Sequence, residues 1–236
     1  MTVMSPFPQA STPTHSSSET ARFPVWIRIG FWVCIAIAVA VVIRRAVALG
    51  HPSAAGPPEL TQLDTYFASH AALTLAHILP ALLFTLLLPF FFTSRFGQSK
   101  TLHESLFFLG AIIGVTAYAM SAHAVGGWIE RSAVLFFNTL YLYSLIRAYG
   151  YARSARLVDQ RRWMTRAVGI LLGIATTRPV MGVFFATSPI THLQPSQFFG
   201  IAFWIGFSIN TIAIELWLRK SAIQPHIERM ASPSRA

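Results

Sequence analysis

Six apolar stretches, each long enough to cross a lipid bilayer, divide this chain of 236 residues. A transmembrane helix needs about 20 mostly apolar residues, and hydrophobic residues make up 54% of the chain against 11% charged residues. The stretches are 25–49, 66–92, 105–124, 132–151, 163–187 and 197–218. Lipid cannot hydrogen-bond to an exposed backbone, and the alternating pattern of barrel strands is absent. The sequence therefore predicts an all-α, polytopic integral membrane protein with a bundle of six transmembrane helices.

Basic residues are concentrated in alternate loops, and this asymmetry predicts the orientation. If the N-terminus is cytoplasmic, the loops on the other side carry only Arg44, Arg45 and Arg131. The cytoplasmic side then carries Arg22, Arg28, Arg95, Lys100, Arg147, Arg153, Arg156, Arg161, Arg162, Arg166, Arg219, Lys220, Arg229 and Arg235. Short cytoplasmic loops collect Lys and Arg, so we expect both termini to be cytoplasmic. The formal net charge of +10 is then explained by topology and by attraction to anionic lipid headgroups, and no nucleic-acid partner is expected.

The two ends of the chain lie outside the predicted bundle. Residues 1–23 are rich in Ser, Thr and Pro and are expected to form a disordered cytoplasmic tail. Residues 24–220 form the transmembrane domain, and 221–236 form a second cytoplasmic tail. Ala46-Val47-Ala48 resembles a signal-peptidase site, but the long region before it and two intervening arginines favour a retained first span. The single cysteine, Cys34, provides neither an intrachain disulfide nor a thiolate zinc cluster and is interpreted as a packing residue.

Four ionisable side chains, His70, His77, His123 and Arg178, are predicted to lie in the outer half of the membrane. At a rise of 1.5 Å per residue, His70 lies about 6 Å and His77 about 16 Å below the outer end of the second span. Arg178 lies about 13 Å below the outer end of the fifth span by the same rise, and His123 lies near the outer end of the third. An ionisable residue inside a membrane marks a functional site by default. These four are therefore candidate cofactor-binding residues, the alternative being that the interfacial histidines serve as anchors.

The cation at position 178 is expected to face the bundle interior, because a charge at this depth needs a compensating partner. Asn138, Tyr118 and backbone carbonyls freed by the prolines of the second and fifth spans are the candidate partners of Arg178. The inner half of the membrane is poorer in polar residues. There, Glu215 and Arg219 have the i,i+4 spacing of a local ion pair.

The histidines suggest a redox or metal site. His70 and His77 differ in height by about 10 Å, which is too far for one metal ion with imidazole bonds of about 2 Å. His70 and His123 lie at similar depths on consecutive antiparallel spans and are expected to face each other. Such a pair would hold a b-type haem, with Arg178 near its carboxylates, or would contribute to a copper or iron site.

Two pairs of glycines have the small-xxx-small spacing that lets membrane helices approach closely. They are Gly110 with Gly114 in the third span and Gly169 with Gly173 in the fifth. Helix packing is the expected role of both pairs.

The residues that lead into the fifth span form a recognisable motif. Asp159-Gln160-Arg161-Arg162-Trp163-Met164-Thr165-Arg166 is followed, twelve residues after Arg166, by Arg178. This pattern resembles the hallmark of a family of bacterial predicted membrane proteins, domain of unknown function 2306, whose members show His-Arg-Arg-Trp-Met-x-Arg before a span. Gln160 stands where that family has histidine, and of a second motif, histidine-arginine-tryptophan, only His103 is matched. The resemblance covers roughly 65–218 in layout and implies a multi-pass protein of the bacterial inner (plasma) membrane. It implies no activity, because the family is uncharacterised.

The motif also indicates a candidate site at the inner face. His103, Arg161 and Arg162 all lie at the cytoplasmic ends of the third and fifth spans. Together they would bind an anion such as a lipid headgroup, an anionic metabolite or a quinone headgroup. The alternative is ordinary anchoring by positive residues on the inner side, with Trp163 at the interface.

Three classes of function are compatible with these features. The sequence contains no Walker loop, no dinucleotide fingerprint, no H-E-x-x-H motif and no G-x-S-x-G motif. A redox or metal-handling protein is favoured by the histidines of the outer half. A small-molecule or lipid transporter is favoured by Arg178 and by the prolines within spans, although inverted repeats are not visible. The third class is a non-catalytic subunit that associates with other membrane proteins.

Overall fold

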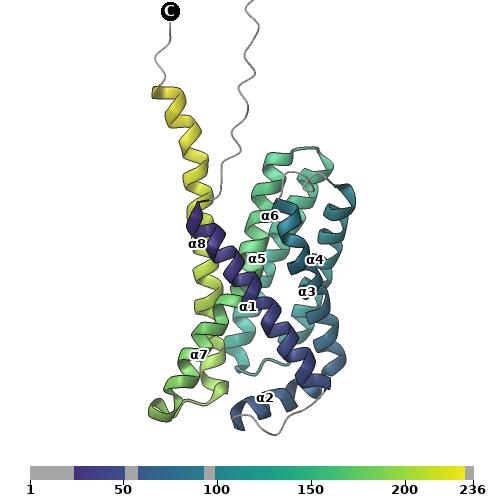
Figure 1. Cartoon of the computed structure of the whole chain (residues 1–236), viewed down its shortest axis with the longest axis vertical. Helices are drawn as coiled ribbons and strands as arrows, with labels where there is room; N and C mark the ends of the chain where they lie inside the picture. Colours follow the sequence, from purple (N-terminus) through teal and green to yellow (C-terminus); the bar gives the residue numbers. More distant parts are fainter. Residues whose placement is uncertain (1–23, 51–57, 93–98, 232–236) are drawn as a thin grey trace, which may run out of the picture.

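The part of the chain that the structure describes is entirely helical, as predicted (Figure 1). The computed structural model describes residues 24–50, 58–92 and 99–231. Its helices are α1 (Val25–Gly50), α2 (Pro58–Ala68), α3 (Ala71–Phe92), α4 (Lys100–Ser121), α5 (Gly127–Arg153), α6 (Leu157–Leu171), α7 (Gly173–Thr191) and α8 (Pro195–Ala231). The tail predicted for residues 1–23 lies outside the described residues. The tail predicted for 221–236 overlaps the last turns of α8, and its remainder lies outside the described residues.

The helices provide six passages through the bundle. Five stretches are long and apolar enough to span a membrane: α1, α3, α4, the α6–α7 pair and α8 as far as Ser221. The sixth passage is α5, whose 27 residues extend about 40 Å at 1.5 Å per residue. Its composition is less apolar because tyrosines, Asn138 and Arg147 interrupt it. The predicted bundle of six transmembrane helices is consistent with this arrangement.

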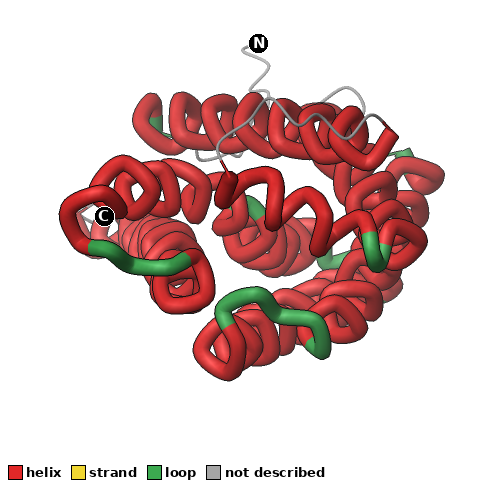
Figure 2. The backbone as a smooth tube through the Cα atoms, turned by 90° about the horizontal axis from the view of Figure 1, so that it is seen from below, coloured by secondary structure: helices red, strands yellow, loops and turns green. Residues whose placement is uncertain are grey.

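Two of the predicted spans are each divided into two helices. The second span was expected to cover 66–92, but α2 ends at Ala68 and α3 begins at Ala71, so His70 lies in the turn between them. Helix α2 lies across one end of the bundle (Figures 1 and 2). We call this end the α2 end, which the sequence predicts to be the outer side, and we call the opposite end the α6 end. The fifth span breaks at Leu172, where α6 gives way to α7.

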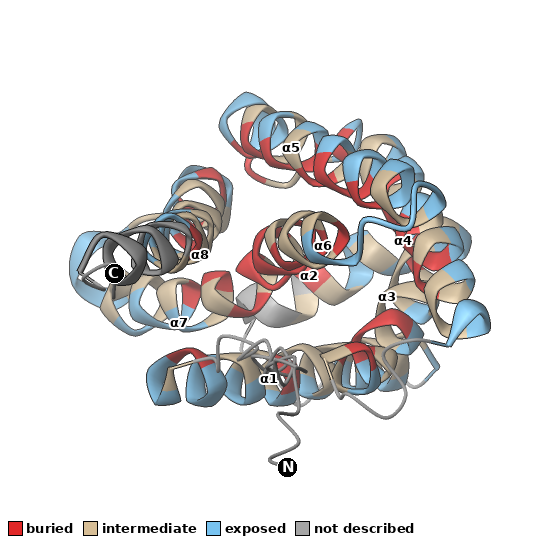
Figure 3. Cartoon of the chain, turned by 90° about the horizontal axis from the view of Figure 1, so that it is seen from above, coloured by how far each residue is buried: buried red, intermediate tan, exposed pale blue. Residues whose placement is uncertain are grey.

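Helix α6 occupies the centre of the bundle when the molecule is viewed from the α6 end (Figure 3). It contacts α5, α7 and α8, and most of its residues from position 164 onward are buried. Met164 and Ala167 have no exposed surface. Polar residues are confined to the first turns of α6, so the apolar remainder can insert between the surrounding helices. The chain then leaves the centre at Leu172, and α7 continues along α8.

The glycine pairs have the packing role that their spacing predicts. A Cβ atom on Gly110 would lie 2.8 Å from a side-chain carbon of Leu145 in α5, and Gly114 faces Leu142 of the same helix. A Cβ on Gly173 would lie 2.9 Å from the Cα atom of Phe207 in α8. Close approach of α4 to α5, and of α7 to α8, therefore requires residues without a side chain at these positions.

Helix α1 is the most peripheral passage. Its buried residues are Ile27 and Ile35, and it crosses the bundle obliquely against α3 and α7 (Figure 1). At the α2 end, Arg45 donates to Asp64 of α2 at 2.6 Å, and Arg44 donates to the same carboxylate at 3.0 Å. These ion pairs connect the end of α1 to α2, so both elements cover the same side of the bundle.

Candidate functional site

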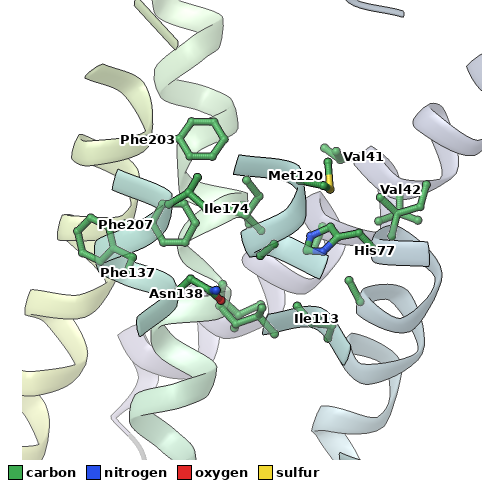
Figure 4. Close-up of a pocket in the computed structure, with 18 of the residues that line it drawn as sticks. Val41, Val42, His77, Ile113, Met120, Phe137, Asn138, Ile174, Phe203 and Phe207 are labelled. Atoms are coloured by element: carbon green, nitrogen blue, oxygen red, sulfur yellow. The ribbon is translucent and has the colours of Figure 1, made fainter. Parts of the chain in front are cut away.

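The helices enclose a cavity of about 230 Å³ that extends from the middle of the bundle toward the α2 end. Every helix contributes to its wall: α1 supplies Val41 and Val42, α3 supplies His77, and α8 supplies Phe203 and Phe207. Figure 4 shows the phenyl rings on one side, and His77 with the two valines on the other. Most of the wall is apolar, so polar groups within it are the features that would recognise a ligand.

Most polar side chains of the wall already have partners within the protein. Asn138 donates to the carbonyl of Gly114 at 2.8 Å, and the Tyr141 hydroxyl donates to the carbonyl of Gly110 at 3.2 Å. Thr85 donates to the carbonyl four residues before it at 2.7 Å. The bonds of Asn138 and Tyr141 join α5 to α4 at the cavity wall, and the bond of Thr85 lies within α3. They leave little capacity there for a ligand.

Arg178 is the exception among the polar side chains of the wall. Its guanidinium group contacts the sulfur of Met181 at 3.7 Å, a weak acceptor, and its Nε is buried without a hydrogen-bond partner among the described residues. No carboxylate of the described residues lies within ion-pair distance of Arg178. The prediction that Arg178 faces the bundle interior is confirmed. Of its predicted partners, Asn138 is bonded to Gly114 instead, and the Tyr118 hydroxyl is 2.7 Å from Thr139.

His77 lies in the same wall with one nitrogen engaged. Its Nδ1 is 2.9 Å from the hydroxyl oxygen of Thr116, and that hydroxyl is also 2.7 Å from the carbonyl oxygen of Ile112. A hydroxyl has one proton, and a carbonyl only accepts. The Thr116 hydroxyl therefore donates to Ile112, and His77 donates from Nδ1. In the neutral ring this tautomer leaves Nε2 as an acceptor, and His77 is one of the residues that line the cavity.

The other charges near the cavity are compensated. Arg45 pairs with Asp64, and its guanidinium lies 4.1 Å from the ring centroid of Phe67. Glu130 lies in the first turn of α5 and accepts a hydrogen bond from the Gly126 amide at 2.6 Å. A carboxylate at this position is also favoured by the helix dipole. The uncompensated charge in the cavity wall is therefore positive and belongs to Arg178.

His70 and His123 face each other at the α2 end, as their similar depths predict. Their ring centroids are 4.1 Å apart with an interplanar angle of 38°. Both lie in turns, His70 before α3 and His123 after α4, and His123 also lines the cavity. The Tyr66 hydroxyl of α2 donates to the carbonyl of His123 at 3.0 Å. This contact therefore attaches α2 to the α4–α5 turn.

This histidine pair does not fit a b-type haem. Each axial imidazole needs an iron–nitrogen distance of about 2 Å, which places the two ring centroids about 6 Å apart on opposite faces of the haem. The observed 4.1 Å between His70 and His123 leaves no room for the macrocycle. No group of three or more His, Cys, Asp or Glu side chains with metal-binding geometry occurs in the described ranges.

The inner-face candidates are brought together only in part. The side-chain nitrogen of Gln160 is 3.4 Å from Nδ1 of His103, and the ring of Phe91 lies 5.3 Å from that of His103. Gln160 is 1% exposed, so this amide, which stands where the resembled family has histidine, is a buried contact between α4 and α6. Arg161 and Arg162 lie on the next residues of α6, and neither forms an ion pair within the described part of the chain.

Two interactions of charged groups that are important for the structure were missed by sequence reasoning. Glu130 was not considered, although Gly126 and Gly127, four and three residues before it, signal the start of a helix that a carboxylate would stabilise. Glu215 pairs with Arg219 at 3.3 Å, as predicted, but its shorter contact is with Arg166 of α6 at 2.8 Å. The latter pair joins α6 to α8 near the α6 end.

Comparison with known proteins places the chain among membrane proteins. A family model described as "Predicted membrane protein (DUF2306)" matches residues 66–218, which is more than half of the chain. The match begins within α2, so α1 lies before it, whereas His77, Glu130 and Arg178 lie within it. No curated protein and no solved structure is significantly similar to the chain.

Proposed function

This chain belongs to the predicted membrane-protein family DUF2306, and we propose that it is a small-molecule transporter or carrier whose ligand occupies the cavity between α1 and the rest of the bundle. The observation that carries the proposal is the unpaired Arg178 in the wall of an otherwise apolar cavity. An intramembrane charge is costly unless something compensates it. A bound ligand would provide that compensation.

The shape of the cavity supports the same proposal. A largely apolar pocket with a few convergent polar groups is the usual form of a small-molecule site. The volume of about 230 Å³ corresponds to roughly eight water-sized groups at about 30 Å³ each. The ligand, or the part of it that enters the bundle, is therefore small. Helix α1 supplies one wall and is itself weakly buried, so it is the element whose displacement would open the site to lipid.

Substitution on α1 tests this proposal. Ala38 lines the cavity, whereas Ala40, two residues further along the same helix, is exposed on the outside of the bundle. We expect wild-type protein in phosphatidylcholine nanodiscs to bind radiolabelled octanol or octanoate saturably. Ala38→Phe should weaken this binding at least about tenfold, because a phenyl group would fill much of the cavity. Ala40→Phe, the matched control, should bind as the wild type does.

Two results would contradict the proposal. One is the absence of saturable binding of either probe above that of empty nanodiscs. The other is equal binding by Ala38→Phe and Ala40→Phe, since the probe would then occupy the lipid-facing surface.

Metal binding is a second candidate function, favoured by the contact between His70 and His123. Imidazole nitrogens about 2 Å from one ion place each ring centroid about 3 Å from it. A centroid separation of 4.1 Å is therefore compatible with adjacent coordination positions on one copper, iron or zinc ion. The remaining ligands would have to be water or a bound molecule. A redox or metal-handling role would follow from such a site.

Elemental analysis of the purified protein tests whether His70 and His123 bind a metal ion. Protein purified after growth with added metals should carry close to one equivalent of a transition metal, and His70→Asn should lose it. His192→Asn is the matched control, because His192 is an exposed histidine at the same end with a left-handed backbone that Asn tolerates. Metal-free wild-type protein, or equal metal content in the two variants, would rule the candidate out.

A further inference from the structure

We infer that the ligand of this cavity carries a single negatively charged oxyanion, a carboxylate or a phosphodiester, that binds the Arg178 guanidinium, with an apolar group against the cavity wall. This inference rests on the proposed function and adds the chemical class of the ligand. Guanidinium groups bind carboxylates and phosphates through parallel N–H···O bonds. The Nε of Arg178 has no acceptor among the described residues and its Nη1 contacts only the sulfur of Met181, so an oxyanion in the cavity would provide this guanidinium group with an acceptor.

The charge must be negative because the surrounding charges do not neutralise Arg178. Arg45 and Arg44 repel it, and Glu130 attracts it without reaching ion-pair distance. The Glu130 carboxylate is already engaged by the amide of Gly126 at the start of α5. A neutral ligand would leave the guanidinium uncompensated, and an amine would add repulsion.

The charge is single because Glu130 lines the same cavity. A second negative charge on the ligand would face this carboxylate in an environment where apolar walls strengthen electrostatic repulsion. In the Nδ1–H tautomer, His77 has an acceptor at Nε2, which would suit a protonated or hydroxyl oxygen better than a second anionic one. The walls supplied by Ile113 and Ile174 accommodate only an apolar remainder.

Competition binding tests the class of ligand directly on the wild-type protein. In phosphatidylcholine nanodiscs, octanoate should displace a bound radiolabelled octyl probe at least about tenfold more effectively than octanol, the range expected for a charge-assisted hydrogen bond. Octylamine should be the weakest competitor. Protein in a non-ionic maltoside detergent, which contains no phosphate, identifies the source of the oxyanion. If a lipid phosphodiester is the natural ligand, added phosphatidylcholine or phosphatidylglycerol should displace octanoate there. If a free carboxylate is the ligand, neither lipid should compete with octanoate.

Substitution of the cation completes the test. Arg178→Gln should abolish the preference for octanoate over octanol while octanol still binds, and Arg178→Lys should retain part of it because the charge remains without the two-pronged geometry. Arg131→Gln removes an exposed arginine from the same end of the bundle and should change nothing.

The outcomes separate this inference from the proposed function. If octanol and octanoate compete equally in the wild type and both are blocked by Ala38→Phe, the cavity binds ligands and the oxyanion inference is wrong. An unchanged preference in Arg178→Gln would also overturn it. If no probe binds saturably, the proposed function itself fails.

Discussion

Reporters fused after the C-terminus and inserted between residues 188 and 196 are expected to lie on opposite sides of the membrane. Alkaline phosphatase at 188–196 should be active, because it needs the oxidising compartment to form its disulfides. Phosphatase at the C-terminus should be inactive, and a fluorescent protein fused there should fluoresce. The physical reason is the distribution of basic residues about the two ends of the bundle. At the α2 end, Arg44, Arg45 and Arg131 are the basic residues near the helix ends, and two of these bind Asp64.

The structure makes this prediction sharper than hydropathy alone. The segment at 188–196 joins α7 to α8 at the α2 end, and α8 then runs the length of the bundle to the opposite end (Figure 1). The two reporters are thus separated by one complete passage. Activity of the phosphatase at both positions would mean that α8 does not cross the membrane. Activity only at the C-terminus would mean that the whole bundle is inverted.

Hydropathy predicted the helical passages because it depends on composition, which a membrane constrains strongly. It did not predict the divisions within them. Residues 58–68 form a short helix on the bundle end, whereas the predicted second span began only at residue 66. The break at Leu172 lies inside an apolar run, and Gly173, which directly follows it, was interpreted only as a packing residue. Its cause is tertiary, since α6 packs in the centre and α7 packs along α8.

The residues of the candidate site could be predicted from the sequence, but the contacts between them could not. His77, His123 and Arg178 were grouped by depth, and the structure brings all three to one cavity wall. Depth carries no information on rotation about the helix axis, so the partners of Arg178 were not predictable. The depth estimate also assumed one continuous helix over 66–92. Because α2 and α3 are separate helices, His70 lies in the turn between them and not within a span. Whether these residues bind a ligand or cofactor stays a prediction.

Glu130→Leu is expected to lower the thermal unfolding temperature of the ligand-free protein more than any surface substitution. Glu130 is 8% exposed, accepts the hydrogen bond from Gly126 and is the acidic group that attracts Arg178. Leucine at this position leaves the buried Gly126 amide without its acceptor, at a cost of about 1–3 kcal/mol, and removes a negative charge that the start of α5 favours by up to about 1 kcal/mol. A loss of about 3 kcal/mol corresponds to about 6–12 °C for a chain of this size. Glu104→Gln, which removes an exposed carboxylate, should change the free energy of unfolding by less than about 0.5 kcal/mol.

A double-mutant cycle identifies the origin of this loss. Glu130→Gln keeps an acceptor for the Gly126 amide and removes the charge, so its cost reports mainly on Arg178. If the two charges stabilise each other across the cavity, the combination of Glu130→Gln with Arg178→Gln should be more stable than the sum of the single effects, by about 1–2 kcal/mol. Strictly additive effects in ligand-free protein would show that Glu130 acts on the start of α5 alone. The charge of Arg178 would then be wholly uncompensated in the empty cavity. A bound oxyanion would stabilise the protein more than it would if Glu130 compensated part of that charge.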